Sequence, residues 1–230
     1  MSSGRGCAPT WPSTAGGGQR RPDAPGVRGP FYAPLVEILP ATIDLWDQLA
    51  DLFARRGGPD TPFCWCIFWR LRSKDFSEAT PAVNRERLRG LVEQGPPPGL
   101  VAIEDGRAIG WVGLAPRAEY QRIERSRVIP RVEGPNPWVV SCFVVSLDAR
   151  GRGVASALLA AAVDHARVAG AAALEGYPID PARVEGGRVR DTGAYVGTRS
   201  MFERAGFGIV ARTSSKSGGA PRVVARLDLA

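Results

Sequence analysis

The sequence predicts a single α/β domain, more closely an α+β mixed sheet. Three observations lead to this class. A strand-like run passes directly into a glycine turn and a helical pattern between residues 139 and 159. Asp105-Gly106 lies between two apolar runs, as in a tight hairpin. Short apolar runs alternate with helically spaced segments along most of the 230 residues, a length that suits one full core plus a tail.

The elements are expected in the order β-α-α-β-β-β-α-β-α-β-β. The expected strands are short, largely apolar runs bounded by turn residues. They cover residues 35–39, 100–104, 108–114, 138–146, 171–177, 208–213 and 222–229. The expected helices cover residues 43–53, 82–94 and 153–169, with a short fourth helix before Phe207. Gly57-Gly58 and Gly95 end the first two helices. The arginine-rich segment after residue 114 shows neither the spacing of a helix nor the alternation of a strand, so we expect it to be irregular.

Residues 1–32 differ from the rest of the chain in composition. They are rich in Gly, Pro, Ser and Arg, which cannot bury enough apolar surface to offset the entropy of ordering. We therefore expect a disordered tail at 1–32 and one domain at 33–230. No apolar stretch approaches the roughly 20 residues that span a bilayer, and no signal-peptide core is visible. A cytoplasmic location without membrane contact is expected.

The turn between the strand at 138–146 and the next helix is suited to phosphate. The first amides of a helix lack intrahelical partners, and the helix dipole adds positive potential there. Arg150 and Arg152 flank the turn and could reach further phosphate oxygens. The pattern predicts a phosphorylated cofactor.

The run Arg150-Gly151-Arg152-Gly153-Val154-Ala155 fits the signature R/Q-x-x-G-x-G/A and resembles the GNAT superfamily of acetyl-CoA-dependent N-acyltransferases. The element order and the closing run Phe202–Phe207 extend this resemblance over about residues 33–230. The resemblance implies that the amides of 151–155 hold the pyrophosphate of acetyl-CoA. It also implies that Cys142, Phe143, Val144 and Val145 pair through their backbone with the pantetheine arm, and that an amide near a bulge at 143–145 receives the oxyanion.

The implied reaction is the attack of a neutral primary amine, on a small molecule or a peptide, at the acetyl thioester through a tetrahedral intermediate. Glu175 is the first candidate for the general base, because desolvation beside an apolar strand makes a carboxylate more basic. The alternative is that Glu175 pairs with a nearby arginine or meets solvent. Glu133 and Glu104 are weaker candidates.

The general acid is less clear. Family members often have a tyrosine where this chain has Phe202, so Tyr195 and Tyr177 are the substitutes, or else they are walls of the acceptor pocket. The thiolate could also leave without an acid. Covalent transfer through Cys142 is disfavoured, because a buried cysteine usually only packs. Phe202 also keeps a second function class open, a non-catalytic acyl-CoA-binding sensor or scaffold.

An aromatic segment at 63–70 borders the acceptor groove in the family. Trp65 and Trp69 could shape an apolar or cationic acceptor site, or simply fill the core. Arg70 and Arg72 would instead mark an acidic acceptor. These cues conflict, so the sequence leaves the identity of the acceptor open. It also leaves open whether the protein forms a homodimer.

Other classes fit the sequence less well. Gly151-x-Gly153 could also begin a Rossmann dinucleotide-binding fingerprint, with Glu175 as the acidic residue that binds the ribose. However, Ser156 stands where that fingerprint requires Gly or Ala. Cys64-x-Cys66 lacks zinc spacing and His165 is the only histidine, so neither a metal site nor a His-dependent triad is expected. A net charge of +7 alone does not indicate nucleic-acid binding, because CoA is itself an anion.

Overall fold

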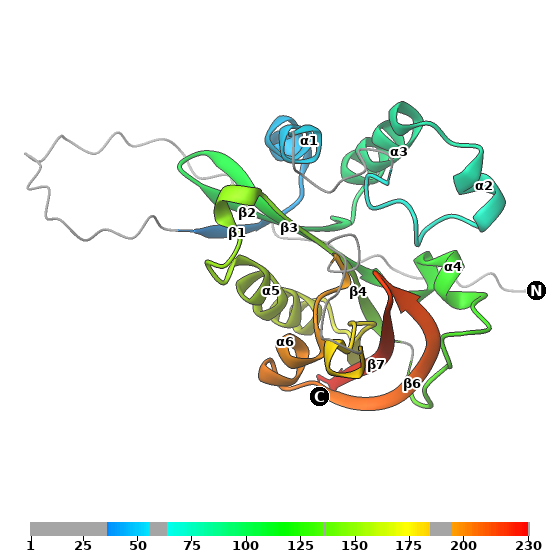
Figure 1. The fold of residues 1–230 in the computed structure, drawn as a ribbon. Helices are drawn as coiled ribbons and strands as arrows, with labels where there is room; N and C mark the ends of the chain where they lie inside the picture. Colours follow the sequence, from blue (N-terminus) through cyan, green and yellow to red (C-terminus); the bar gives the residue numbers. More distant parts are fainter. Residues whose placement is uncertain (1–35, 56–63, 136, 185–194, 230) are drawn as a thin grey trace, which may run out of the picture. The chain divides into compact units, whose positions relative to one another are not determined.

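The computed structural model describes residues 36–55, 64–135, 137–184 and 195–229. They belong to one compact unit, Leu35–Ala230, built on a seven-stranded sheet in the order β1-β2-β3-β4-β5-β7-β6 (Figure 1). The β4–β5 pair is parallel and the other pairs are antiparallel. The strands are β1 Glu37–Pro40, β2 Gly99–Glu104, β3 Arg107–Pro116, β4 Trp138–Val145, β5 Ala173–Gly176, β6 Gly208–Ser217 and β7 Ala220–Asp228. The mixed sheet confirms the predicted fold class, whereas the predicted tail at 1–32 lies outside the described residues.

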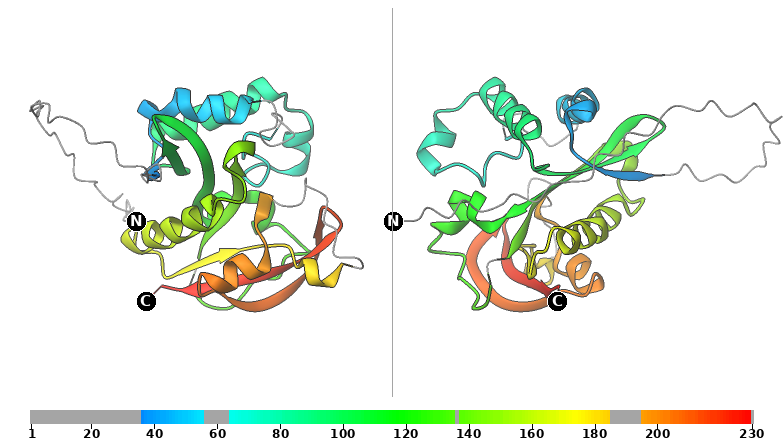
Figure 2. Two further views of the ribbon diagram at one scale, coloured as in Figure 1. Left: turned by 60° about the vertical axis from the view of Figure 1, so that its left-hand side comes forward. Right: turned by 180° about the vertical axis from the view of Figure 1, so that it is seen from behind.

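Helices cover both faces of the sheet. Figures 1 and 2 show α1 and α3 on one face, and α5 and α6 on the other. The helices are α1 Trp46–Ala54, α2 Ser73–Ser77, α3 Pro81–Gln94, α4 Gln121–Glu124, α5 Val154–Val168 and α6 Arg199–Arg204, and the 3₁₀ turns are η1 Ile43–Leu45, η2 Arg117–Glu119, η3 Leu147–Ala149 and η4 Pro181–Arg183. None of the helices in the described part of the chain has the length and apolar character to cross a membrane.

Two apolar clusters join these layers to the sheet. One packs Leu158 and Ala162 of α5 against β2, β3 and β4, and the other packs α1 and the segment around Trp65 against the opposite face. Leu158 and Ala162 therefore lie on the buried face of α5. His165, from the same helix, is half-buried with its ring 6.1 Å from the Trp138 ring, and burial lowers its pKa.

Local sequence explains where the main elements begin and turn. Asp105 and Gly106 both have positive φ, 49° and 73°, as a two-residue hairpin turn requires. The Thr80 hydroxyl accepts a hydrogen bond from the Val83 amide at 3.3 Å and Pro81 opens α3, which makes a capped helix start.

The predicted order of elements is found with two additions. Helices α2 and α4 were not expected, and α4 lies in the segment predicted to be irregular. They have 5 and 4 residues, which is too short to show an apolar period. Strand β6 extends to Ser217 rather than residue 213, because its second half is a polar edge strand.

Strand β4 separates from β5 part-way along its length. The two strands pair only from Trp138 to Val140, and a bulge at Ser141 then shifts the register against β3. Beyond Val140, no described strand pairs with the β5-side edge of β4, although β3 still covers its other edge as far as Val145. This opening leaves backbone donors and acceptors free where β4 leads into α5.

Candidate active site

The glycine turn at the start of α5 has the predicted shape. The first backbone bond of the helix runs from the Ala157 amide to the Gly153 oxygen at 3.0 Å, so the amides of residues 154–156 lack intrahelical partners. Gly151 and Gly153 have φ of 74° and 84°, and a Cβ placed on either would meet no atom within 4 Å. The turn therefore faces open space with its amides, a surface that fits a phosphate group.

The two arginines of this turn differ in their contacts. Arg150 donates from Nε to the Val145 oxygen at 3.4 Å. Arg152 forms a two-point ion pair with Glu104 of β2, with one contact at 3.1 Å. Arg152 must therefore leave the Glu104 carboxylate before it can bind a phosphate. Nothing in the sequence indicated this ion pair.

A cavity of about 520 Å³ lies beside β4 on the face that carries α1. Its β4 wall consists of Ser141, Cys142 and Val144. Its other described lining residues are Phe53, Cys64, Trp65, Cys66, Phe68, Trp69, Phe76, Tyr195, Val196, Lys216, Ser217, Gly218 and Arg222. The volume suits a small molecule, and six of the described lining residues are aromatic.

The β4 wall begins at the bulge. Gly113 lies opposite Cys142, and a Cβ on Gly113 would come within 2.6 Å of the Ser141 hydroxyl oxygen, so this glycine makes room for the bulged residue. The bulge was expected within 143–145 and lies earlier, at Ser141. Cys142 and Val144 line the cavity, whereas the side chains of Phe143 and Val145 pack on the α5 side.

The cysteine of this wall is in contact with a second thiol. Cys66 Sγ lies 3.1 Å from Cys142 Sγ, and the Trp111 indole N–H donates to Cys66 Sγ at 3.1 Å. Burial raises the pKa of the Cys66 thiol well above its usual value, and that of Cys64 to about 12. These two thiols stay protonated at neutral pH.

The structure brings both predicted acceptor-site tryptophans to the cavity. Trp65 is buried and stacks on Phe53 at 5.2 Å, so it serves the core as well as the cavity wall. Trp69 is half-buried and lies edge-on to Phe68 at 4.9 Å. The two arginines considered for an acidic acceptor form ion pairs within the protein: Arg70 pairs with Glu119, and Arg72 pairs with Asp75 at 2.9 Å.

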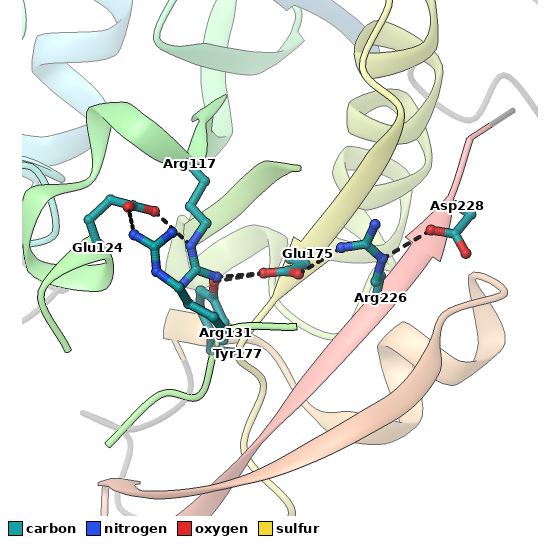
Figure 3. A network of polar contacts seen from close by, with 7 residues as sticks. All are labelled: Arg117, Glu124, Arg131, Glu175, Tyr177, Arg226 and Asp228. Atoms are coloured by element: carbon teal, nitrogen blue, oxygen red, sulfur yellow. Dashed lines mark hydrogen bonds and ion pairs between the residues drawn. The ribbon is translucent and has the colours of Figure 1, made fainter. Parts of the chain in front are cut away.

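Glu175 lies in a buried network of ion pairs rather than in the cavity (Figure 3). Its two oxygens accept from Arg117 Nη1 at 2.9 Å and from Arg226 Nη1 at 3.0 Å. The Tyr177 hydroxyl donates to the same carboxylate at 3.0 Å, and only 1% of the Glu175 side chain is exposed. The expectation that desolvation makes Glu175 a base did not include these two guanidinium groups, which compensate its charge. The alternative expectation, that Glu175 pairs with a nearby arginine, describes its surroundings in the structure.

The network ties three parts of the fold together. Arg226 lies opposite Glu175 in the β5–β7 register and also contacts Asp228 at 3.0 Å. Arg117 reaches Glu124 of α4 at 2.8 Å, and Arg131 contacts the same Glu124. The segment between β3 and β4 is thus fixed to the centre of the sheet.

Of the two substitute tyrosines, only Tyr195 lines the cavity. Tyr177 is buried in the network, and burial raises its pKa well above the usual value. Phe202 is also buried, with its ring 6.3 Å from the Phe143 ring and 5.0 Å from the Phe207 ring. Glu133 is exposed and Glu104 pairs with Arg152, so neither contributes to the cavity.

Sequence reasoning missed several lining residues, of which Arg222 is the most notable. It comes from β7, about 150 residues from the aromatic segment, and no local motif marks it. Phe68 and Phe76 could have been found from their aromatic neighbours. No trio of His, Cys, Asp and Glu side chains suited to a metal ion occurs within 36–55, 64–135, 137–184 and 195–229.

Comparisons with known proteins agree with this architecture. The solved structures that share the fold include a protein assigned to the GNAT acetyltransferases from Desulfovibrio desulfuricans and mosquito arylalkylamine N-acetyltransferase-like 5b. The first is 18% identical, with a TM-score of 0.50, and covers 85% of this chain and 100% of its own. The second is 14% identical, with a TM-score of 0.53 and the same two coverages. A search among curated proteins gave no match.

The sequence itself matches a family model. The model for the acetyltransferase (GNAT) family aligns with residues 64–178, half of the chain, which include the aromatic segment, β4 and the glycine turn. The chain belongs to the GNAT acetyltransferase family.

Proposed function

We propose that the protein is an N-acetyltransferase that moves an acetyl group from acetyl-CoA to a primary amine of a small molecule or peptide. The observation that supports this most is the double role of β4. Its residues Ser141, Cys142 and Val144 line the aromatic cavity, and its far end leads into the glycine turn. One strand therefore connects the glycine turn, where we place the phosphate, with a cavity of ligand size.

In this proposal, the amides from Gly151 to Ala155 hold the pyrophosphate of acetyl-CoA. The unpaired edge of β4 beyond Val140 takes the pantetheine arm, because extended backbone offers donors and acceptors to an amide-containing chain. The thioester then ends near the bulge, and the acceptor amine approaches from the cavity. A β4 amide freed at the bulge receives the negative charge that develops on the carbonyl oxygen.

Tyr195 is the proposed proton donor to the departing thiolate, because it is the candidate hydroxyl that lines the cavity. Glu175 and Tyr177 take positioning roles in the buried network instead. The attack itself requires the amine in its neutral form, and the proton that its nitrogen loses as the amide forms passes to water. The rate should therefore rise with pH until the bound amine is deprotonated.

A thiol-release assay with acetyl-CoA and a panel of primary amines tests the proposal. The expected result is release of CoA that depends on an acceptor, with the acetylated amine identified by mass spectrometry. Binding of acetyl-CoA without turnover on any amine would support the non-catalytic alternative, which is favoured by the buried Phe202 at the position of the usual tyrosine. Absence of acetyl-CoA binding would contradict both.

Replacement of Cys142 tests direct transfer against a covalent acyl-enzyme. We expect Cys142→Ala to retain most of the activity, because the side chain in contact with its thiol is Cys66 rather than a base. Its neighbour Cys66 is itself a protonated thiol, and His165 lies on the α5 side of the sheet. The measurement is kcat/KM together with acetyl-CoA affinity. Loss of activity by several orders of magnitude with intact affinity would show that Cys142 carries the acetyl group.

A further inference from the structure

Arg222 is a buried arginine of the cavity wall, and it pairs with no acidic side chain among the residues that the structure describes. It lies near the start of β7 and is 7% exposed. Its backbone is fixed, because it forms a bridge with Ile179 and its carbonyl oxygen accepts from the Thr213 hydroxyl at 3.2 Å. The side chain therefore has a defined place in the wall.

The guanidinium group stands over an aromatic ring. Its Cζ lies 4.9 Å from the centre of the Trp69 ring, while the Nε and Nη1 atoms are buried and donate no hydrogen bond to the described residues. The ring compensates part of the charge, but it satisfies no N–H group. Buried donors are nearly always hydrogen-bonded in proteins, so two unsatisfied nitrogen atoms in a cavity wall require an explanation.

The other two buried arginines have a carboxylate partner, which Arg222 lacks among the described residues. Arg117 and Arg226 are buried to a similar degree, and each pairs with the carboxylate of Glu175. Arg222 forms no ion pair with any carboxylate in the described part of the chain. Burial lowers its pKa to about 10, which still leaves the group cationic at neutral pH. Among the described residues, no carboxylate compensates this positive charge in the wall.

The rest of the described lining increases the positive character of the cavity. Lys216 adds a second cation, and no Asp or Glu is among the described lining residues. An acceptor with several ammonium groups would meet like charge, and the described lining offers it no counterion. The rings of Trp65, Trp69, Phe68 and Phe76 offer apolar surface instead.

We propose that the acceptor is an aminocarboxylate with an apolar or aromatic body, and that Arg222 binds its carboxylate. The inference rests on the proposed acetyl transfer and specifies its substrate class. The carboxylate pairs with the guanidinium group and, once the side chain turns its buried N–H groups toward the cavity, satisfies them through charge-assisted hydrogen bonds. The apolar body packs on the rings, and the amino group faces the β4 wall at Ser141 and Cys142. Apolar and aromatic α-amino acids belong to this class.

The test compares acceptors that differ only in the carboxylate. The matched pairs are phenylalanine with phenylethylamine, tryptophan with tryptamine, and leucine with isoamylamine, assayed by thiol release and mass spectrometry. The wild-type protein should prefer the acid member of at least one pair by roughly 10- to 100-fold in kcat/KM, the range of a charge-assisted hydrogen bond. Equal rates within every pair, or preference for the decarboxylated amines, would overturn the inference while leaving acetyl transfer in place.

Variants connect this preference to Arg222. Arg222→Gln should remove the preference by raising KM for the acid and leave the decarboxylated amine within about threefold. Arg222→Lys should restore part of the preference. Arg125→Gln removes the same charge at an exposed site outside the cavity and should change neither rate. An equal loss for both members of a pair in Arg222→Gln would mean a merely structural role and would contradict the inference.

If no amine is acetylated, the role of Arg222 is tested by ligand binding instead. Calorimetry of the CoA-loaded protein would compare N-acetylphenylalanine with N-acetylphenylethylamine. Tighter binding of the acid to the wild-type protein, and its loss in Arg222→Gln, supports the inference without turnover. Binding of neither compound overturns it. Failure to bind CoA at all would instead show that the proposed function is wrong.

Discussion

Gly153→Val is expected to weaken the binding of acetyl-CoA strongly. Gly153 has a φ of 84°, a conformation that is strongly disfavoured for valine, and its missing side chain leaves the space that the phosphate requires. A valine there blocks the approach of the phosphate and distorts the first amides of α5. The loss of two charge-assisted hydrogen bonds predicts a decrease in affinity of roughly 100-fold or more, measured by calorimetry.

Gly170→Val is the matched control. Gly170 lies just beyond the other end of α5, has a φ of 74°, and a Cβ there also meets no atom within 4 Å. The two variants should therefore lose similar stability, about 1–2 kcal/mol for a left-handed residue with a side chain. Only Gly153→Val should lose acetyl-CoA binding. Unchanged affinity in Gly153→Val would show that the turn is not the phosphate site.

Glu175→Ala is expected to lower the free energy of unfolding by about 3–5 kcal/mol, the range for removing one member of a buried ion pair. The substitution leaves the guanidinium groups of Arg117 and Arg226 buried without their shared carboxylate. Chemical denaturation measures the loss. Glu93→Ala, which breaks the exposed pair with Arg89, should change the same quantity by less than about 1 kcal/mol.

The milder Glu175→Gln separates this structural role from catalysis. The amide keeps the size of the side chain but loses the charge, so the protein should be destabilised. Any fall in kcat should follow the fraction of folded protein. A fully stable Glu175→Gln protein with kcat lowered by orders of magnitude would restore Glu175 as the general base and contradict the network account.

The fold could be predicted from local sequence because its main elements carry strong local signals. Asp105-Gly106 and Gly153 stand at backbone positions with positive φ, and each is visible in the sequence as a turn residue. Helices α2 and α4 carry no such signal, because one turn of helix contains too few residues to show a period. The opening between β4 and β5 was also hidden, because it depends on register rather than on residue type.

The candidate site was predictable only where its residues lie close together in the sequence. The 63–70 segment and β4 carry their own patterns, so Trp65 and Trp69 could be assigned to the acceptor site and Cys142 to the cofactor-binding strand. The environment of Glu175 could not, because its partners Arg117 and Arg226 come from separate elements that only the sheet order brings together. Arg222 was missed for the same reason: one arginine among 30 basic residues looks like surface charge until β7 is placed beside the aromatic segment.

Titration calorimetry of the wild-type protein with acetyl-CoA, and with desulfo-CoA as a non-reacting analogue, tests the central claim most directly. The account predicts saturable binding of both ligands and a concentration-dependent rise in melting temperature, because a ligand that binds only the folded state stabilises it. Absence of heat with either ligand, together with a melting temperature unchanged at millimolar ligand, would contradict the assignment of the β4–α5 turn as a CoA-binding site.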